Sequence, residues 1–203
     1  MRLKQPTSAH LAWLNTAEYI LVLQPHEALE NKVLQVRQSF REKFDTIHLG
    51  NRVNLTLVRF KTWQQMEERL IHRLDLTAMA FPPFRVYFKN YEALPAHTIF
   101  IHVPFTEGLR QLQNKLRSAA RLMKTPDYTP YFIQEPHIPI ARRMNPQQFE
   151  TAWKKYSTKS FNSSFIAESM LLLKREQTDK AWKIVHRFAF MNLPIETVQG
   201  NLF

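Results

Sequence analysis

The chain has 203 residues, 44% of them hydrophobic and 12% aromatic, so it can bury a sizeable core and is expected to be globular. Its 28 Lys and Arg outnumber 17 Asp and Glu, and the formal charge of +11 favours anionic partners such as nucleic acid, nucleotides or acidic lipid. The lack of cysteine excludes disulfides, thiolate metal sites and a cysteine nucleophile, and 3 glycines are too few for a phosphate-cradling GxGxxG or GxxxxGK loop.

The N-terminal region carries Arg2 and Lys4 before an apolar stretch, which Asn15 and Glu18 interrupt and which no small-residue cleavage site follows. No segment approaches the roughly 18 consecutive apolar residues that a membrane-spanning helix requires. We therefore expect an unprocessed, soluble protein located in the cytoplasm.

Hydrophobic spacing predicts elements in the order β-α-β-α-β-β-α-β-α-β-β. The first six are expected at residues 19–23, 26–44, 51–60, 63–80, 84–91 and 97–105. The remaining five are expected at residues 109–124, 137–142, 146–156, 165–174 and 181–190. No low-complexity linker divides the chain, so two halves would have to pack closely against each other.

Two of these strands share a six-residue pattern. Residues 54–59 read NLTLVR and residues 137–142 read HIPIAR, each placed before a helix that leads into two further strands. The repeat predicts two related half-domains that face one another. Coincidence is the alternative, because any two strands alternate apolar and polar residues.

The repeated strands would direct polar side chains into a shared space. Residues i and i+2 lie on the same face of a strand, so Asn54 would project beside Thr56, and His137 beside Pro139. Arg59 and Arg142 have the opposite parity, so they would reach that space only past a strand end or a bulge.

With these residues in place, the sequence resembles the two-histidine phosphoesterase superfamily, which includes 2′-5′ RNA ligase-like proteins and cyclic nucleotide phosphodiesterases. That family carries two H-x-T/S motifs. NLTL matches the first, with Asn54 in the histidine position and Thr56 in the hydroxyl position, and HIPI matches the second, with His137 present and Pro139 replacing the hydroxyl residue. The order of elements also matches from about residue 19 to residue 190.

The resemblance implies an α+β, bilobal fold in which two pseudo-symmetric half-domains place antiparallel sheets around a central cleft, with helices outside. The whole chain, 1–203, would be one bilobal domain. The first motif half would span about 45–95 and the second about 125–190, with strands exchanged between the lobes.

In active relatives the two histidines are thought to serve as general base and general acid on a phosphodiester or a 2′,3′-cyclic phosphate, and the hydroxyls to bind phosphate oxygens. The resemblance implies no metal and no cofactor. Asparagine exchanges no proton, so Asn54 could orient a phosphate without catalysing attack on it. Pro139 lacks both the hydroxyl and a backbone N–H, which predicts a bulge or an unpaired stretch of strand there.

The resemblance therefore assigns roles as follows: His137 and Asn54 as the catalytic positions, Thr56, Arg59 and Arg142 as phosphate ligands, and Pro139 as a lost motif position. The expected ligand is a nucleotide or RNA whose phosphate lies in the cleft. Outside the motifs, His102 is read as a structural or cleft-edge residue. Tyr87, Phe88 and Tyr91 could stack on a base, although core packing is the alternative.

The predicted helix 109–124 carries basic residues and no acidic residue. Four of them are expected to share one side and are candidate RNA contacts: Arg110, Arg117, Arg121 and Lys124. An RNA backbone could lie along this stripe, but a solvated helix face is the more common explanation.

Three functions remain open from the sequence. The first is a protein with a degraded two-histidine site that binds a nucleotide or RNA phosphate with weak or no phosphodiesterase activity. The second is an active 2′,3′-cyclic phosphodiesterase that uses His137 with a substitute acid or base, such as His102 or a water held by Asn54. The third is a non-catalytic RNA-binding or adaptor protein that uses the basic helix.

Overall fold

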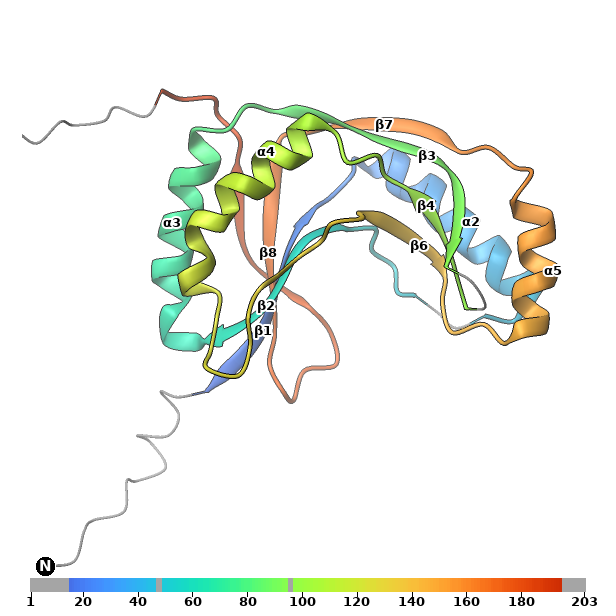
Figure 1. The fold of residues 1–203 in the computed structure, drawn as a ribbon, viewed down its shortest axis with the longest axis horizontal. Helices are drawn as coiled ribbons and strands as arrows, with labels where there is room; N and C mark the ends of the chain where they lie inside the picture. The colour runs from blue at the N-terminus through green and yellow to red at the C-terminus, as the bar shows by residue number, and fades with distance from the viewer. Residues whose placement is uncertain (1–14, 47–48, 95–96, 195–203) are drawn as a thin grey trace, which may run out of the picture.

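Two antiparallel sheets with helices packed against them make up the computed structural model, which describes residues 15–46, 49–94 and 97–194 (Figure 1). The five-stranded sheet runs β5 (Tyr131–Phe132), β2 (Leu55–Trp63), β1 (Thr16–Leu23), β8 (Ser169–Arg175), β9 (Lys183–Ala189). The four-stranded sheet runs β6 (His137–Ala141), β4 (Thr98–His102), β3 (Phe84–Leu94), β7 (Asn162–Ala167). The helices are α2 (Glu27–Phe44), α3 (Glu67–Met79), α4 (Glu107–Leu116) and α5 (Pro146–Tyr156), with 3₁₀ segments η1 (Gln64–Met66) and η2 (Arg117–Leu122).

The helices gather at two ends of the molecule. Figure 1 shows α3 and α4 together at one end and α2 and α5 at the other. Helix α3 packs against β9 of the five-stranded sheet, whereas α2 and α5 pack against β6 and β4 of the four-stranded sheet. The expected α+β fold with two half-domains is confirmed.

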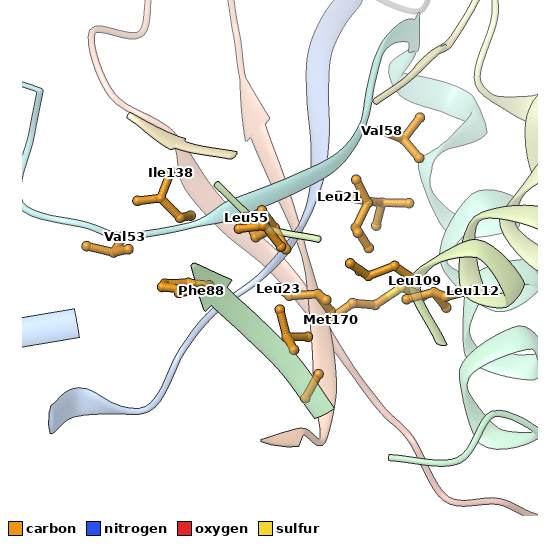
Figure 2. Packing of buried hydrophobic residues seen from close by; sticks show 14 of the residues in the cluster. Leu21, Leu23, Val53, Leu55, Val58, Phe88, Leu109, Leu112, Ile138 and Met170 are labelled. Carbon is orange, nitrogen blue, oxygen red and sulfur yellow. The ribbon is translucent and has the colours of Figure 1, made fainter. Parts of the chain in front are cut away.

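One large hydrophobic core joins the two sheets and the helices. Figure 2 shows Leu21, Leu23 and Leu55 of the five-stranded sheet beside Phe88 and Ile138 of the four-stranded sheet, with side chains of α4 close by. Each strand contributes alternate residues to this core, as period-two patterning requires. The sheets are therefore held in a fixed relation to each other.

The opposite face of the five-stranded sheet carries a second, smaller cluster. Ile20 and Val22 of β1 point there together with Leu171 and Leu173 of β8, and Trp182 packs against them. These side chains lie outside the main core and form an apolar patch on the other face of the sheet.

Helix α2 begins and ends with recognisable caps. The His26 Nδ1 atom accepts a hydrogen bond from the backbone N–H of Leu29 at 3.2 Å, and acidic residues fill the first turn. Arg41 and Lys43 occupy the last turn, where cations interact favourably with the helix dipole. The helix buries Leu29, Val33 and Phe40 on one stripe, which fixes its rotation over the sheet.

Two predicted elements were wrong in detail. The strand expected at 165–174 is two strands, β7 and β8, which lie in different sheets and are separated by Glu168. The chain passes from one sheet to the other at Glu168, whose carbonyl accepts a hydrogen bond from the backbone N–H of Phe190. The apolar run through this region contains no Gly or Pro that would have marked the break.

The helix expected at 109–124 is also divided. Helix α4 ends at Leu116, and the chain continues as 3₁₀ helix through η2, which has about three residues per turn instead of 3.6. The predicted common side of Arg110, Arg117, Arg121 and Lys124 on one α-helix is therefore wrong. Among the helices of the described residues, none is long and apolar enough to cross a membrane.

Candidate nucleotide-phosphate site

The two motif segments meet at one cleft. Asn54 immediately precedes β2, Thr56 lies within it, and His137 begins β6. All six motif residues singled out from the sequence line a single open cavity of about 660 Å³: Asn54, Thr56, Arg59, His137, Pro139 and Arg142. The expectation that the two polar pairs share one space agrees with this geometry.

A bulge in β2 brings Arg59 into the cleft. On the β1–β2 ladder Leu21 pairs with Val58 but Val22 pairs with Thr56, so Leu57 is an extra residue. The extra residue reverses the parity of the strand beyond it. Thr56 and Arg59 consequently lie on the same face, and the predicted route past a bulge is confirmed.

The second motif strand has a bulge at the corresponding position. On the β4–β6 ladder Phe100 pairs with Pro139 but Ile99 pairs with Ala141, which leaves Ile140 as the extra residue. Arg142, just beyond the end of β6, then faces the same cavity as Pro139. The two strands thus share a bulge and an arginine as well as a residue pattern.

His137 is oriented by its own backbone neighbourhood. Its Nδ1 atom lies 2.9 Å from the carbonyl oxygen of Glu135, and its ring packs on Phe100 with centroids 4.7 Å apart. A carbonyl only accepts, so Nδ1 carries the proton and donates it in this hydrogen bond. Nε2 is then the nitrogen available to accept a proton from a ligand, or to donate one when the ring is charged.

Asn54 presents a buried amide. Its Oδ1 atom is buried and accepts no hydrogen bond within the described residues. Buried polar atoms are normally paired, so this oxygen is an unusual unpaired acceptor among the described residues. The amide cannot replace a histidine in proton transfer.

Pro139 lies on an edge strand. Strand β6 pairs only with β4 in the four-stranded sheet, and its bulge falls directly after the proline. The missing N–H therefore costs little in ladder hydrogen bonds. The carbonyl of Pro139 accepts a hydrogen bond from Arg37 Nε at 3.0 Å, so the predicted irregular stretch is confirmed.

Arg37 of α2 is one of the cleft residues that the sequence did not reveal. Its Nη1 atom donates to the carbonyl of Arg52 at 2.9 Å, so one guanidinium joins the segments leading to both motifs. Burial, with a contribution from the charge of Arg142, lowers the pKa of Arg37 to about 10. The sequence does carry one signal for it. Arg37 lies four residues after Val33 and three before Phe40, so its charged side chain falls on the buried stripe of the helix.

The cleft is strongly cationic. Burial and the nearby charges of Arg59 and Arg143 lower the pKa of Arg142. The guanidinium groups therefore lie close enough together to repel one another. The cations that line the cavity are Arg37, Arg52, Arg59, Arg142 and Lys180. No Asp or Glu from the described ranges lines it, so a bound anion would have no acidic competitor in the wall.

One wall of the cleft is apolar. Ile20, Leu173 and Trp182 line the cavity from the small cluster on the five-stranded sheet. The guanidinium of Arg175 stacks on the Trp182 ring at 4.8 Å. A charged wall beside an apolar wall suits a ligand with a phosphate at one end and a planar base or sugar at the other.

His102 lies at the edge of the site. It is directly opposite His137 on the β4–β6 ladder, and its Nδ1 atom is 3.4 Å from Glu92 Oε2. It lines a neighbouring cavity of about 350 Å³ that also includes His137, but it does not line the cleft of Asn54. Tyr91 and Phe88 are buried in the core, while Tyr87 is 40% exposed on β3.

The candidate RNA contacts lie elsewhere. Arg110 forms an ion pair with Glu107 at 3.0 Å, and Arg117 packs over the Phe132 ring at 4.4 Å. Neither these two residues nor Arg121 and Lys124 belong to the wall of the cleft. In the part of the chain that the structure describes, no three His, Cys, Asp or Glu side chains are grouped to hold a metal ion.

Comparison with known proteins identifies the class. The family model described as the 2′-5′ RNA ligase superfamily matches residues 25–179. This match covers more than half of the chain, and the chain belongs to the 2′-5′ RNA ligase superfamily. The resemblance to two-histidine phosphoesterases is thereby confirmed, whereas no curated protein matches the sequence.

Solved structures share the fold at low sequence identity. Escherichia coli LigT complexed with 3′-AMP is 16% identical with a TM-score of 0.60, and the match covers 87% of this chain and 98% of LigT. The protein TT0787 of Thermus thermophilus is 18% identical with a TM-score of 0.61, covering 86% and 98%. A phosphoesterase structure is 16% identical with a TM-score of 0.63, and its match covers 86% and 98% as well. LigT has also been solved with phosphate and with ATP.

Proposed function

We propose that the cleft binds the phosphate of a nucleotide or RNA end and that the protein hydrolyses phosphodiesters slowly or not at all. The observation that supports this most is the asymmetry of the site. The two motif segments and their arginines line one cavity, but only one of the two proton-transfer positions holds a histidine.

Each residue has a distinct part in the proposed binding. The Thr56 hydroxyl and the Asn54 amide donate hydrogen bonds to phosphate oxygens, while Arg59 and Arg142 supply charge-assisted contacts. The His137 Nε2 atom faces the ligand because Nδ1 is held by the Glu135 carbonyl. Trp182 and its apolar neighbours accommodate the nucleoside.

We expect limited catalysis because the site has too few side chains that can transfer a proton. Opening a 2′,3′-cyclic phosphate requires a base that takes a proton from the attacking water and an acid that protonates the leaving ribose oxygen. His137 can serve one of these roles, but Asn54 can serve neither. The loss of one positioned proton-transfer group costs about 10² to 10⁴ in rate, so we describe the protein as a pseudoenzyme or a slow enzyme.

A second candidate is an active cyclic phosphodiesterase in which His102 replaces the missing group. It is favoured by the direct cross-strand position of His102 opposite His137 and by the Glu92 carboxylate beside it. The location of His102 outside the Asn54 cleft favours the first candidate. If His102→Ala leaves turnover intact while His137→Ala abolishes it, the second candidate is rejected.

The deciding experiment is hydrolysis of RNA that ends in a 2′,3′-cyclic phosphate, at high enzyme concentration, by wild type, His137→Ala and His72→Ala. His72 is exposed on α3 and controls for loss of a histidine away from the cleft. Turnover that only His137→Ala removes would identify a one-histidine enzyme. Measurable turnover that is equal in all three proteins would contradict the assigned site, and no turnover in any of them would favour a pseudoenzyme on these substrates.

Binding is tested separately by nucleotide titration followed through the histidine NMR resonances. The His137 resonance should shift and that of His72 should not. If the His137 resonance does not shift at millimolar nucleotide, the binding proposal fails.

We also propose the half-domain division, with the motif halves at about 45–95 and 125–190 and strands exchanged between them.

A further inference from the structure

We propose that the cleft selects a terminal phosphate monoester, which is a dianion, over a cyclic phosphate or a phosphodiester, which are monoanions, and that Arg37 is one of the anion ligands. The inference rests on the proposed function, because it requires a nucleotide phosphate in this cleft. It adds the chemical class of that phosphate and a ligand residue outside both motifs.

Arg37 is held in place by two backbone carbonyls. Its Nε donates to Pro139 and its Nη1 to Arg52, at 3.0 and 2.9 Å. A guanidinium has five N–H groups, and the remaining three make no hydrogen bond to the described part of the chain. The group lines the cleft, so a fixed and charged donor is available to an anion without further ordering of the side chain.

The position of Arg37 gives it a specific relation to the second motif. It binds the carbonyl of Pro139, the residue that stands where the motif would have a hydroxyl. A hydroxyl would contribute one neutral hydrogen bond, whereas a guanidinium contributes a full positive charge and paired donors. The site therefore holds a charged donor next to the position that lacks a hydroxyl, which favours ligands of higher charge.

The wall of the cleft has a charge surplus that a monoanion would leave largely uncompensated. Five cations line the cavity, and no carboxylate of residues 15–46, 49–94 or 97–194 does so. Repulsion among these cations contributes to the lowered pKa values of Arg37 and Arg142. Coulomb attraction scales with ligand charge, so a dianion relieves about twice as much of this repulsion as a monoanion does.

Phosphate chemistry supplies a second distinction. A terminal monoester offers three free oxygens to the arginines, whereas a cyclic phosphate or diester offers two. The second pKa of a phosphate monoester is about 6, so the dianion predominates above neutral pH and the monoanion at about pH 5. Hydrolysis of a 2′,3′-cyclic phosphate adds water across one P–O bond and yields such a monoester, so the preferred ligand is the product class of that reaction.

Other charged and titratable groups face the same space, so their effect on binding must be distinguished from the effect of the charge on the ligand. The cleft contains Arg37 from α2, Arg52 and Arg59 around β2, His137 and Arg142 around β6, and Lys180 between β8 and β9. Glu30 of α2 interacts electrostatically with Arg37. Both ligands meet these same groups at each pH, so the ratio of the two affinities compares the charges of the two ligands.

The test is isothermal titration calorimetry of the full chain with adenosine 3′-phosphate and with adenosine 2′,3′-cyclic phosphate. At about pH 7.5 we expect the monoester to bind at least about tenfold more tightly, the effect of one added charge in a partly desolvated site. At about pH 5, where the monoester is mostly a monoanion, we expect the ratio to fall below about threefold.

Variants assign the effect to Arg37. Arg37→Gln should reduce the ratio at the higher pH, whereas Lys43→Gln, which removes an exposed charge from the last turn of the same helix, should leave it unchanged. Thermal unfolding checks each variant. If Arg37→Gln does not fold, Arg37→Lys keeps the charge and loses the two-carbonyl clamp, and the wild-type ratio still tests the selectivity.

Each outcome decides something different. Equal affinities at the higher pH, or tighter binding of the cyclic phosphate, overturn the dianion preference but leave the proposed function standing. A ratio that Arg37→Gln and Lys43→Gln leave equally unchanged overturns the role of Arg37. Failure of both ligands to bind overturns this inference together with the proposed function.

Discussion

The strands β2 and β6 carry the same architecture, and each holds a different part of the H-x-T/S pattern. Each has one extra residue directly after the third motif position, and each aims an arginine into the cleft beyond that bulge. The first retains the hydroxyl residue Thr56 without a histidine, and the second retains His137 without a hydroxyl. The comparison teaches that both halves share a bulge and an arginine that faces the cleft, whereas the histidine and the hydroxyl residue of the motif each occur in only one half.

Sheet position explains which loss each strand tolerates. Strand β2 lies inside its sheet between β5 and β1, whereas β6 is an edge strand. Proline cannot donate to a ladder, so it is acceptable at the edge and costly inside. The proline therefore stands in the half where its backbone cost is smallest.

The largest expected effect comes from making the two halves alike. Asn54→His combined with Pro139→Thr supplies a second imidazole and a second hydroxyl in the existing cleft. We expect hydrolysis of a 2′,3′-cyclic phosphate to rise by about 10² to 10⁴, measured as single-turnover rates. Pro139→Thr alone is the matched control and should gain little, because it adds no proton-transfer group. An inactive double variant that still binds nucleotide would show that the two halves are not aligned for catalysis.

The next effect concerns stability. Thr56→Pro places a proline in the interior strand and should lower the free energy of unfolding by about 2 kcal/mol or more, since a buried ladder partner is left unpaired. The reverse change on the edge strand, Pro139→Thr, should alter it by less than about 1 kcal/mol. Chemical denaturation measures both. Similar costs for the two changes would contradict the argument from sheet position.

A smaller effect tests the arginines as a pair. Arg59→Gln and Arg142→Gln should each weaken nucleotide binding about tenfold, because each removes one charge-assisted contact. Arg143→Gln controls for charge, since Arg143 follows Arg142 but does not line the cleft. Calorimetry measures the affinities. If only one of the two variants binds nucleotide more weakly, the two arginines do not have the equivalent roles that the two bulges suggest.

The smallest effect is expected away from both motif strands. Charge reversal at Arg117 and Arg121 should change RNA affinity at low salt by less than about threefold, because these residues act on the cleft only through screened long-range attraction. Filter binding across a salt series measures it. A large loss with a flatter salt slope would instead support the third function, binding of RNA along the basic surface.

Local sequence signals were sufficient where an element begins and ends with recognisable residues. Helix α5 was predicted over the residues it occupies, and its start shows why: Asn145 and Gln148 form a capping box, and Pro146 occupies the first turn. The boundary between β7 and β8 has no such signal, because Glu168 lies in a run that reads as one strand. The end of α4 at Leu116 was missed for the same reason.

The candidate site divides in the same way. The chemical limits of Asn54 and Pro139 follow from their side chains alone. The position of Arg37 in the cleft does not follow from the sequence, because 102 residues separate it from the carbonyl it binds on Pro139. A basic residue near the buried stripe of a helix looks the same whether it reaches solvent or a distant strand.

The sequence by itself determined most of the elements, the two matching motif strands and the inability of the Asn54 amide to transfer a proton. Only the tertiary structure decided that both motifs line one cleft, that a bulge in each strand turns its arginine inward and that Arg37 joins them. The physical reason is that periodicity encodes the two faces of an isolated strand. A bulge, a change of sheet or a hydrogen bond to a remote carbonyl is fixed by pairing with chain that is far away in sequence.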